Sequence, residues 1–249
     1  MRVDVALVPP ASAPLDATCL VVDVLRATSV MAVLFGRGLR AAWLAGSIEE
    51  GRAVRAALGE RSRGLMLCGE EHALAPAGFD YGNSPLEFER VALPAEAVLA
   101  TTNGTPALLA CAGAPLVMPA APLNADAAVH TALNAGRDVL IVCAGLVTEA
   151  GVRAPGDDDT LAAGLLVARL VRMGLQAGDE ATLALERYEA ARGDLAAALR
   201  ATHHGARITE LGFGADVDRC AQTDVYDTVA TLRVEDGRAV LRPASERSR

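Results

Sequence analysis

The stretch from residue 18 to residue 29, Thr-Cys-Leu-Val-Val-Asp-Val-Leu-Arg-Ala-Thr-Ser, decides the fold. Its first part, from Thr18 to Val24, is almost entirely apolar and predicts a β-strand. The residues from Ala27 to Phe35 predict a helix directly behind it. A strand that is apolar on both faces belongs to a parallel sheet covered by helices on both sides. The stretch therefore predicts an α/β protein.

The same alternation of strands and helices continues along the chain. Further strands are predicted at residues 3–8, 40–45, 64–68, 98–101, 116–118 and 139–143, with helices between them. Ser47 caps one of these helices, with Glu50 three residues later as its capping-box partner. The pattern from Asp157 to Cys220 is helical, and a terminal hairpin is predicted around Gly237. We expect a three-layer α/β/α fold with a mostly parallel or mixed sheet and a helix-rich C-terminal third.

The length of 249 residues is enough to bury a real core in one large domain. We expect a single α/β domain over residues 1–242, with a helical subdomain over residues 157–221 left open. Residues 243–249 are expected to be a frayed tail. Hydrophobic residues make up 52% of the chain and aromatic residues only 3%, so the core must consist of Ala, Val and Leu.

The charge composition limits the class of partner. The net charge is -8 and there is no basic run, so nucleic acid is not an expected partner. The sequence contains no Lys, and all 23 cationic residues are therefore Arg. This excludes a Walker A lysine and a Schiff-base lysine. Any fixed side-chain cation that binds phosphate must be Arg, which suits bidentate binding.

The cysteines and the apolar stretches indicate a cytoplasmic protein. The five cysteines are far apart, no CxxC occurs, and none has an Arg at the C-x5-R spacing of a catalytic cysteine. Buried thiols in a reducing compartment are the expected state. The N-terminus lacks the pattern of a signal peptide. Residues 97–125 carry no charge, but four prolines would break a spanning helix, so no membrane partner is expected.

Ligands of open α/β sheets bind beyond the carboxyl ends of the strands, and four loops at such positions are polar. In the first loop, Asp23 ends the strand and Arg26 and Thr28 begin the next helix. Arg26 could bind phosphate through its planar fork, while Asp23 holds a metal ion or attacks phosphorus. The alternative is a helix-capping loop in which Arg26 pairs with Asp23 or another acid.

The second loop offers hard oxygen ligands. Glu70 directly follows a predicted strand, and Asp80, Asn83 and Ser84 lie in a turn bounded by glycine. Mg²⁺ prefers few carboxylates together with water and substrate phosphate. The alternative is a surface turn that caps the helix beginning at Pro85.

The third and fourth loops have the composition of anion and metal sites. Thr101-Thr102-Asn103-Gly104-Thr105 joins a strand to a helix and resembles a phosphate-binding nest of backbone amides. Asp157-Asp158-Asp159 begins an Ala-rich helix and could bind a metal ion. Plain helix capping is the alternative for both loops. Together, the four loops carry the groups needed for metal-assisted phosphoryl transfer.

The ordered set of motifs resembles the 2-phosphosulfolactate phosphatase family, from about residue 3 to residue 240. The motifs that carry the resemblance are Asp23-Val-Leu-Arg26-Ala-Thr28, Gly78-Phe-Asp80-x-Gly82-Asn83-Ser84-Pro85-x-Glu87, Thr101-Thr102-Asn103-Gly104-Thr105, Asp158-Asp159-x-x-Ala-Ala-Gly164, His204-Gly205 and Asp216-Val217-x-x-Cys220-Ala-Gln222-x-Asp224. The resemblance implies a three-layer α/β fold and a requirement for Mg²⁺. It also implies hydrolysis of 2-phospho-3-sulfolactate to 3-sulfolactate and phosphate, a step of coenzyme M biosynthesis.

The chain departs from the family pattern at two places. Glu71 stands where the pattern has Arg, and Asp158-Asp159 stands where the pattern has Glu-Asp. The first departure removes a cation near the expected site. A phosphatase for a different small phospho-acid and a non-catalytic phosphate- or sulfonate-binding module therefore stay open as alternatives.

The expected site combines catalytic, substrate-binding and metal-binding residues. Attack by a Mg²⁺-bound water and a covalent aspartyl-phosphate on Asp23 both stay open. The expected partner is a small anionic phosphoester, and a homodimer is a weaker expectation. The candidate residues are Asp23 and Arg26 for catalysis, Thr28, Asn83, Ser84, Thr101, Thr102, Asn103, Gly104, Thr105 and His204 for substrate binding, and Asp23, Glu70, Asp80 and Asp159 for Mg²⁺.

Overall fold

The structure is a computed structural model that describes residues 1–59, 64–148 and 150–244. Five parallel strands form sheet A in the spatial order β10-β1-β7-β2-β6. They are β1 (Arg2–Ala6), β2 (Thr18–Val22), β6 (Leu116–Pro119), β7 (Val139–Cys143) and β10 (Gln176–Ala177). In β2, Leu20 and Val22 point to one core while Cys19 and Val21 point to the other. The stretch that predicted a doubly buried strand therefore forms one.

A second sheet, sheet B, has the spatial order β11-β12-β3-β5-β4. Its strands are β3 (Ala41–Ala45), β4 (Met66–Gly69), β5 (Glu96–Ala100), β11 (Ala230–Glu235) and β12 (Arg238–Pro243). The first three run parallel, and the terminal hairpin β11–β12 joins them antiparallel to β3. A small hairpin, β8 (Leu146–Val147) with β9 (Arg153–Ala154), follows β7.

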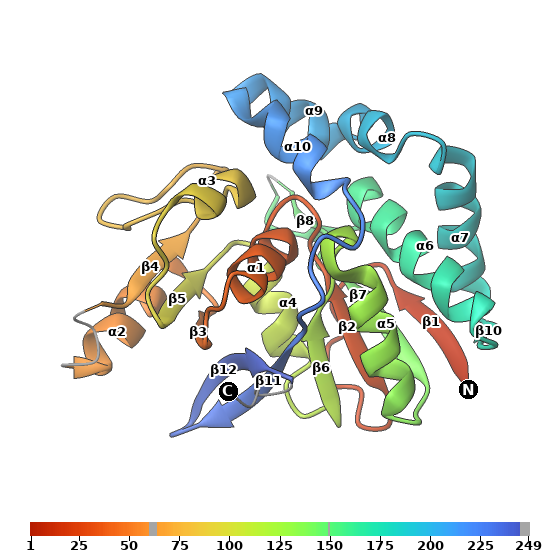
Figure 1. The fold of residues 1–249 in the computed structure, drawn as a ribbon, viewed down its shortest axis with the longest axis horizontal. Coiled ribbons are helices and arrows are strands. Elements are labelled where there is room, and N and C mark those ends of the chain that lie inside the picture. The colour runs from red at the N-terminus through yellow and green to blue at the C-terminus, as the bar shows by residue number, and fades with distance from the viewer. Residues whose placement is uncertain (60–63, 149, 245–249) are drawn as a thin grey trace.

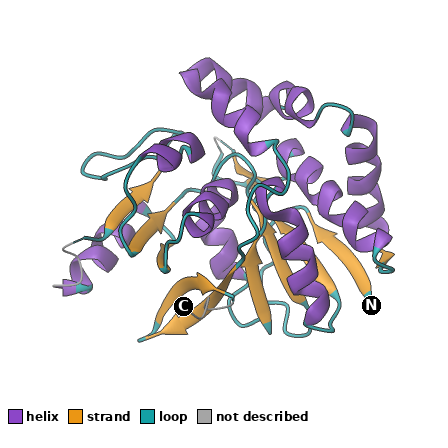
Figure 2. Ribbon diagram, in the orientation of Figure 1, coloured by secondary structure: helices purple, strands orange, loops and turns teal. Residues whose placement is uncertain are grey.

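Helices and sheets alternate in layers (Figures 1 and 2). Helices α5 (Ala125–Asn134), α6 (Asp157–Arg172) and α7 (Asp179–Ala191) cover one face of sheet A. Helices α1 (Ala27–Gly36) and α4 (Gly104–Ala110) share a core with the other face of sheet A and with sheet B. Helix α2 (Ile48–Ala57) packs on the far face of sheet B.

The last helices form a cap over the carboxyl ends of the strands of sheet A (Figure 1). The cap consists of α8 (Leu195–Ala201), α9 (His203–Ile208), the π-helical turn η3 (Thr209–Phe213) and α10 (Gly214–Cys220). Helix α10 packs against α3 (Pro85–Arg90) and α8. A short turn, η2 (Pro122–Asn124), precedes α5. The cap therefore faces the strand ends where ligands of α/β sheets bind.

The predicted α/β class is confirmed, with helices on both faces of parallel sheet A. The division of the strands into two sheets was not predicted, because strands of either sheet show the same alternation with helices. Ser47 caps α2 as expected, and its Oγ accepts a hydrogen bond from the N–H of Glu50.

The predicted boundary between the domain and its C-terminal tail lies close to the end of β12. Pro243 belongs to β12 rather than to the predicted tail, and the N–H of Ala244 donates to the carbonyl of Val229. The remaining predicted tail, residues 245–249, lies outside the described residues. Within the described ranges, no helix is long and apolar enough to cross a membrane.

Candidate active site

Asp23 follows the last residue of β2 and lies between the first turns of two helices. Its Oδ1 accepts a hydrogen bond from the N–H of Ala27, and its backbone carbonyl accepts one from the hydroxyl of Thr28. A Cβ atom at Gly104, the first residue of α4, would lie only 2.8 Å from Asp23 Oδ2 and 2.5 Å from the Cβ of Ala27. Glycine therefore allows α4 to approach this carboxylate. The hydroxyl of Thr28, predicted to bind substrate, is committed to holding the loop.

Asp23 belongs to a group of mutually interacting acids. The pKa of Asp23 is raised to about 6, chiefly by burial, with His204 lowering it and the charges of Glu70 and Asp158 raising it. The pKa of Asp159 is raised well above its usual value by burial, and then by Asp158 and Asp23. We call Asp23, Glu70, Asp158 and Asp159 the acidic cluster. Its negative charge is not fully compensated by the side chains around it.

Asp159 holds two strand ends together. Its Oδ1 accepts from the N–H of Val24 at 2.9 Å, and its Oδ2 accepts from the N–H of Gly145 at 3.0 Å. These contacts join the loop after β2 to the loop after β7. Both oxygens of this predicted metal ligand therefore already bind backbone N–H groups.

His204 contributes a cation to the cluster from the helical cap. Its Nδ1 lies 2.9 Å from Asp158 Oδ2, and Asp158 is 97% buried as a side chain. Burial lowers the pKa of His204, but the hydrogen bond with Asp158 and the charges of Asp158, Asp23 and Glu70 outweigh it, so the net shift is upward. The imidazole is thus favoured in its protonated form, with Nδ1 held by Asp158 and Nε2 on the opposite edge of the ring.

Glu70 organises the turn after β4. Its Oε2 accepts from the N–H of Ala73 and its Oε1 accepts from the N–H of Thr102, at 3.0 and 2.9 Å. His72 and Ala73 have φ angles of 53° and 70°, which L-residues seldom adopt. Two consecutive residues in this region form a tight turn that Glu70 fixes from one side.

Arg26 does not point into solvent as a free phosphate-binding cation. Its side chain is 2% exposed, and its Nη1 lies 2.7 Å from Asp216 Oδ2 in α10. Its Nη2 donates to the carbonyl of Ala73 at 2.7 Å, and the guanidinium lies over the ring of Phe213 at 4.5 Å. The geometry favours the alternative that Arg26 pairs with an acid and holds the loop, with Asp216 as that acid.

Asp216 connects this ion pair to the second predicted loop. Its Oδ1 accepts from the hydroxyl of Ser84 at 2.7 Å, and Ser84 in turn caps α3 by accepting from the N–H of Glu87. Asn83, beside it, is 6% exposed. Asp216 was part of the motif pattern but not of the predicted site. No local signal pairs it with a residue 190 positions earlier in the chain.

The predicted phosphate nest is largely closed by its own hydrogen bonds. Thr101 and Thr105 each accept the other's backbone N–H through Oγ1, at 3.0 Å in both cases. The N–H of Thr102 binds Glu70, as described above. Asn103 Oδ1 accepts from Arg153 Nη1 at 3.2 Å. Among the described contacts of these five residues, only the backbone N–H groups of Asn103 and Gly104 have no acceptor. These two groups are available to an incoming anion.

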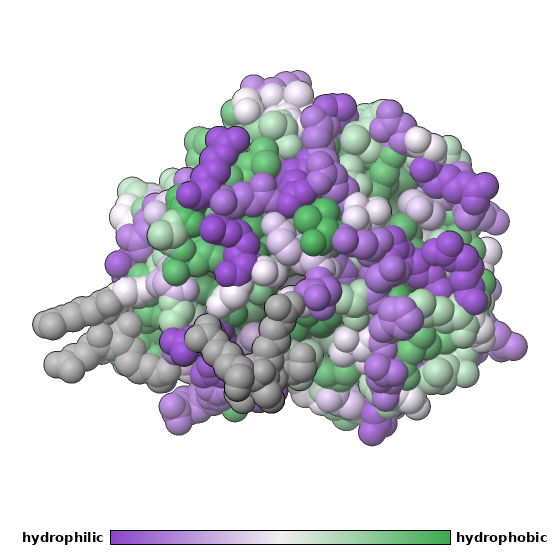
Figure 3. All heavy atoms as spheres, in the orientation of Figure 1, coloured by the Kyte–Doolittle hydropathy of each residue, from purple (hydrophilic) through white to green (hydrophobic). Residues whose placement is uncertain are grey.

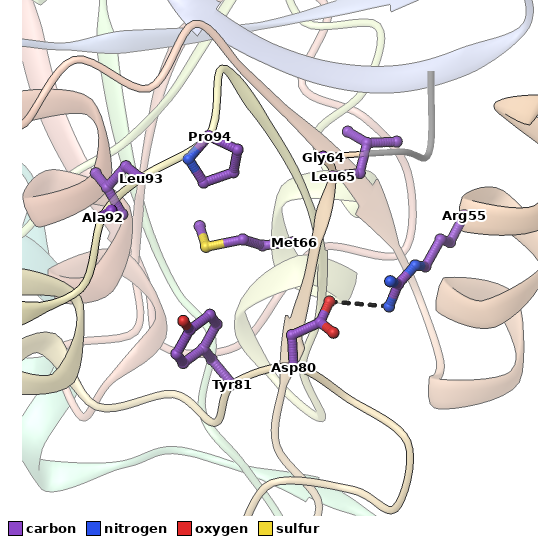
Figure 4. Close-up of a pocket in the computed structure, with 9 residues that line it drawn as sticks. All are labelled: Arg55, Gly64, Leu65, Met66, Asp80, Tyr81, Ala92, Leu93 and Pro94. Atoms are coloured by element: carbon purple, nitrogen blue, oxygen red, sulfur yellow. Dashed lines mark hydrogen bonds and ion pairs between the residues drawn. The ribbon is translucent and has the colours of Figure 1, made fainter. Parts of the chain in front are cut away.

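Asp80 lies apart from the acidic cluster, beside edge strand β4. Its Oδ2 accepts from the N–H of Leu67 and pairs with Arg55 Nη1, at 2.8 and 2.9 Å. Figure 4 shows this pair at the side of a hollow of about 620 Å³, with Met66 and Tyr81 on its wall. The structure therefore does not bring Asp80 to the other three predicted metal ligands.

The predicted metal ligands differ in how well they fit Mg²⁺. Among the residues that the structure describes, no group of three or more His, Cys, Asp or Glu side chains is arranged to hold a metal ion by itself. Mg²⁺ usually keeps several waters and takes one or two carboxylates plus substrate phosphate. The pKa of Asp23 is raised mainly by burial, and Glu70 and Asp158 contribute to the rise, so a bound cation would favour its ionised form. Asp23 fits Mg²⁺, because its Oδ2 accepts no hydrogen bond among the described contacts. Glu70 and Asp159 both bind backbone N–H groups through both oxygens, but Glu70 is half-buried and Asp159 is buried, so Glu70 is the more accessible second ligand. Asp80 binds Leu67 and Arg55 instead.

An acidic cluster, a histidine whose pKa is raised and two helix starts meet at the carboxyl ends of parallel strands, which is where α/β enzymes place their chemistry. Comparison of the sequence with known families narrows the class of enzyme. The sequence pattern of the 2-phosphosulpholactate phosphatases matches residues 6–235, and the chain belongs to that family of phosphoric monoester hydrolases. The family resemblance inferred from the motifs is thereby confirmed.

Relatives from bacteria match over almost their whole length. A protein of Thermotoga petrophila is 35% identical over 92% of this chain and 95% of its own. A protein of Deinococcus radiodurans is 37% identical over 93% of both chains. A protein of Thermus thermophilus is 34% identical over 97% of this chain and 98% of its own. All three carry the name probable 2-phosphosulfolactate phosphatase.

Proposed function

We propose that this protein is a Mg²⁺-dependent phosphatase that hydrolyses 2-phospho-3-sulfolactate to 3-sulfolactate and phosphate. Membership of the family and the names of the relatives support the reaction. The structural observation that carries the proposal is the buried carboxylate of Asp23, at the end of β2 and surrounded by acids and His204. Phosphoryl transfer needs a nucleophile, a cation and a proton donor close together, and this cluster contains candidates for each.

Asp23 and Glu70 are the proposed ligands of Mg²⁺. Bound Mg²⁺ would neutralise phosphoryl oxygens and make a nearby water a better nucleophile. Asp159 positions Asp23, because its contacts with Val24 and Gly145 fix the backbone on either side of the site. The N–H groups of Asn103 and Gly104, at the start of α4, are left to orient the phosphoryl group.

His204 is the proposed proton donor to the leaving oxygen. The alcohol of a lactate ester is a poor leaving group, and its departure needs a proton in the transition state. Asp158 keeps the imidazole protonated and fixes its Nδ1, so that Nε2 is the nitrogen left to donate. As the bond between phosphorus and the ester oxygen breaks, this proton passes to the ester oxygen and the imidazole becomes neutral.

Two routes of attack agree with the position of Asp23. Its carboxylate could attack phosphorus directly, or it could orient an attacking water. The stereochemistry at phosphorus separates the two routes, because each in-line displacement inverts the configuration. With a phosphoester that is chiral at phosphorus through oxygen isotopes, overall retention supports the aspartyl-phosphate and overall inversion supports direct attack by water.

The metal requirement is tested by two measurements on the same preparation. We expect EDTA to abolish phosphate release from 2-phospho-3-sulfolactate, and Mg²⁺ to restore it. We also expect Mg²⁺ to raise the melting temperature, because it relieves repulsion in the acidic cluster. An enzyme that keeps its full rate in EDTA would show that the metal proposal is wrong. Release of phosphate only from other small phospho-acids would replace the substrate but keep the class.

The resemblance also implies a place in coenzyme M biosynthesis, and this stays part of the proposal. The cytoplasmic location and the homodimer stay predictions.

A further inference from the structure

We propose that Arg153 binds an acid group of the substrate other than its phosphate, and thereby selects phosphoesters that carry a carboxylate or a sulfonate. This inference rests on the proposed function, because it concerns the substrate of the same site. Its basis is the position of a guanidinium without an acidic partner beside the acidic cluster.

The guanidinium of Arg153 is fixed between two segments that flank Asp23. Arg153 is the first residue of β9, in the hairpin that follows β7. Its Nη1 donates to the carbonyl of Ala144 at 2.7 Å and to Asn103 Oδ1 at 3.2 Å. The N–H of Ala144 binds the carbonyl of Val22, which directly precedes Asp23.

The second partner of Arg153 leads to the same carboxylate. Asn103 directly precedes Gly104, and a Cβ atom at Gly104 would lie 2.8 Å from Asp23 Oδ2. Arg153 therefore contacts Ala144, which is hydrogen-bonded to the residue before Asp23, and Asn103, which precedes the glycine packed against Asp23. The cation lies at the edge of the reaction site rather than on a remote surface.

The charge of Arg153 is not neutralised by the protein. Both of its acceptors are neutral oxygens, and within residues 1–59, 64–148 and 150–244 no carboxylate forms an ion pair with it. Three other partly or fully buried arginines, by contrast, have acidic partners: Arg26 pairs with Asp216, Arg169 with Asp224, and Arg219 with Glu89. A half-buried cation fixed by neutral groups is pre-organised to bind an anion.

The proposed substrate needs such a cation. It carries a carboxylate and a sulfonate besides its phosphate, and it must approach an acidic cluster. Arg26 is buried and already paired, and His204 is assigned to the leaving oxygen. Arg153 is the remaining cation that the described contacts place beside Asp23. The planar fork of its guanidinium matches the oxygens of a carboxylate or a sulfonate.

The test compares two alkyl phosphoesters. One carries a carboxylate and a sulfonate besides its phosphate, and the other carries the phosphate alone. Phosphate release from 2-phosphosulfolactate and from isopropyl phosphate is measured with Mg²⁺ for the wild type, R153Q and R153K. R153Q should raise KM for 2-phosphosulfolactate by about 10- to 100-fold, the usual effect of losing a hydrogen bond to a charged group. Its KM for isopropyl phosphate should change by less than about 3-fold, and R153K should keep part of the difference.

The matched control is R52Q. Arg52 also donates to a backbone carbonyl, that of Ala77, but it lies on α2 away from Asp23. R52Q should leave both KM values unchanged, and melting temperatures identify any variant that is not folded. Equal losses on both substrates in R153Q, or no loss on either, would overturn the proposal.

Binding of the product, 3-sulfolactate, tests the role of Arg153 independently of the proposed function. 3-Sulfolactate has no phosphate, so its affinity, measured by calorimetry, reports on the carboxylate and the sulfonate alone. Weaker binding to R153Q than to the wild type supports the role of Arg153 even if no phosphoester is hydrolysed, an outcome that would contradict only the proposed function. Equal affinity for both proteins would contradict the role of Arg153, whatever the wild type hydrolyses.

Discussion

His204 is the residue whose protonation should limit activity at high pH. Its pKa lies above the ordinary value near 6.5, because Asp158 accepts from Nδ1 and because Asp23 and Glu70 add negative charge. A raised pKa means that the folded state holds the proton more tightly than the unfolded chain. This contribution to stability is complete below pH 6.5 and is lost as the pH rises through the raised pKa. As a proton donor, His204 loses activity over the same interval.

The role of His204 is tested with two leaving groups. We expect H204Q to lower kcat for 2-phosphosulfolactate by about 100- to 1000-fold, because the ester oxygen then leaves without a proton. The kcat for p-nitrophenyl phosphate should fall by less than about 10-fold, since nitrophenolate leaves readily. H204Q should also lose the decrease in activity at high pH. H203Q is the control, because His203 is exposed and is expected to keep both rates. Equal losses on both substrates would refute the proton-donor role.

At the scale of elements, the buried ion pair between Arg26 and Asp216 holds α10 against the loop after β2. The same guanidinium binds the carbonyl of Ala73, so it also fixes the turn that contains Glu70. Removal of one partner from a buried ion pair leaves the other charge without compensation. The position of the cap against the loop after β2 therefore depends on this pair.

The effect of Arg26 should appear first in stability. We expect R26A to lower the free energy of unfolding by about 3–5 kcal/mol, with activity lost in proportion to the unfolded fraction. R26K should recover only part of this, because an ammonium cannot bind Asp216 and Ala73 in one plane. Denaturant unfolding and kcat are measured for the same samples. A stable R26A whose kcat falls by 100-fold would restore the catalytic assignment made from the sequence.

Some elements of the site could be predicted from the sequence because they are local. Asp23 and Glu70 each follow an apolar strand, and the position after a parallel strand identifies a candidate ligand residue without knowledge of the fold. Thr101 and Thr105 were predicted to bind substrate, and in the structure their hydroxyls accept each other's backbone N–H groups. Composition alone does not distinguish a nest from an N-cap.

At the scale of the whole molecule, the fold class followed from periodicity, but the pairing of distant segments did not. The pairs Asp158–His204 and Arg26–Asp216 join residues that are 46 and 190 positions apart. They form only because the helical C-terminal third folds back over the strand ends (Figure 1). The separation of the strands into two sheets likewise depends on which crossover each helix makes, and local sequence does not specify this.

The composition of the chain favours a small anion over nucleic acid as the expected partner. On the face shown in Figure 3, hydrophilic and hydrophobic residues are interspersed across the cap and the flank of the sheet. The net charge of -8 is unfavourable for polyanions, whereas a small anion can be bound by a few local cations. The arrangement of Arg153 and His204 beside Asp23 provides such local positive charge.

The central claim is that Asp23, at the end of β2, is the centre of a phosphatase site, and D23N tests it most directly. The measurement is phosphate release from 2-phospho-3-sulfolactate with Mg²⁺ by the wild type and by D23N, together with both melting temperatures. Because burial raises the pKa of Asp23 to about 6, its ionised form destabilises the fold at neutral pH, and D23N should melt no lower than the wild type. We predict that the wild type releases phosphate and that folded D23N is slower by on the order of 1000-fold or more. A folded D23N that keeps the wild-type rate would contradict the account.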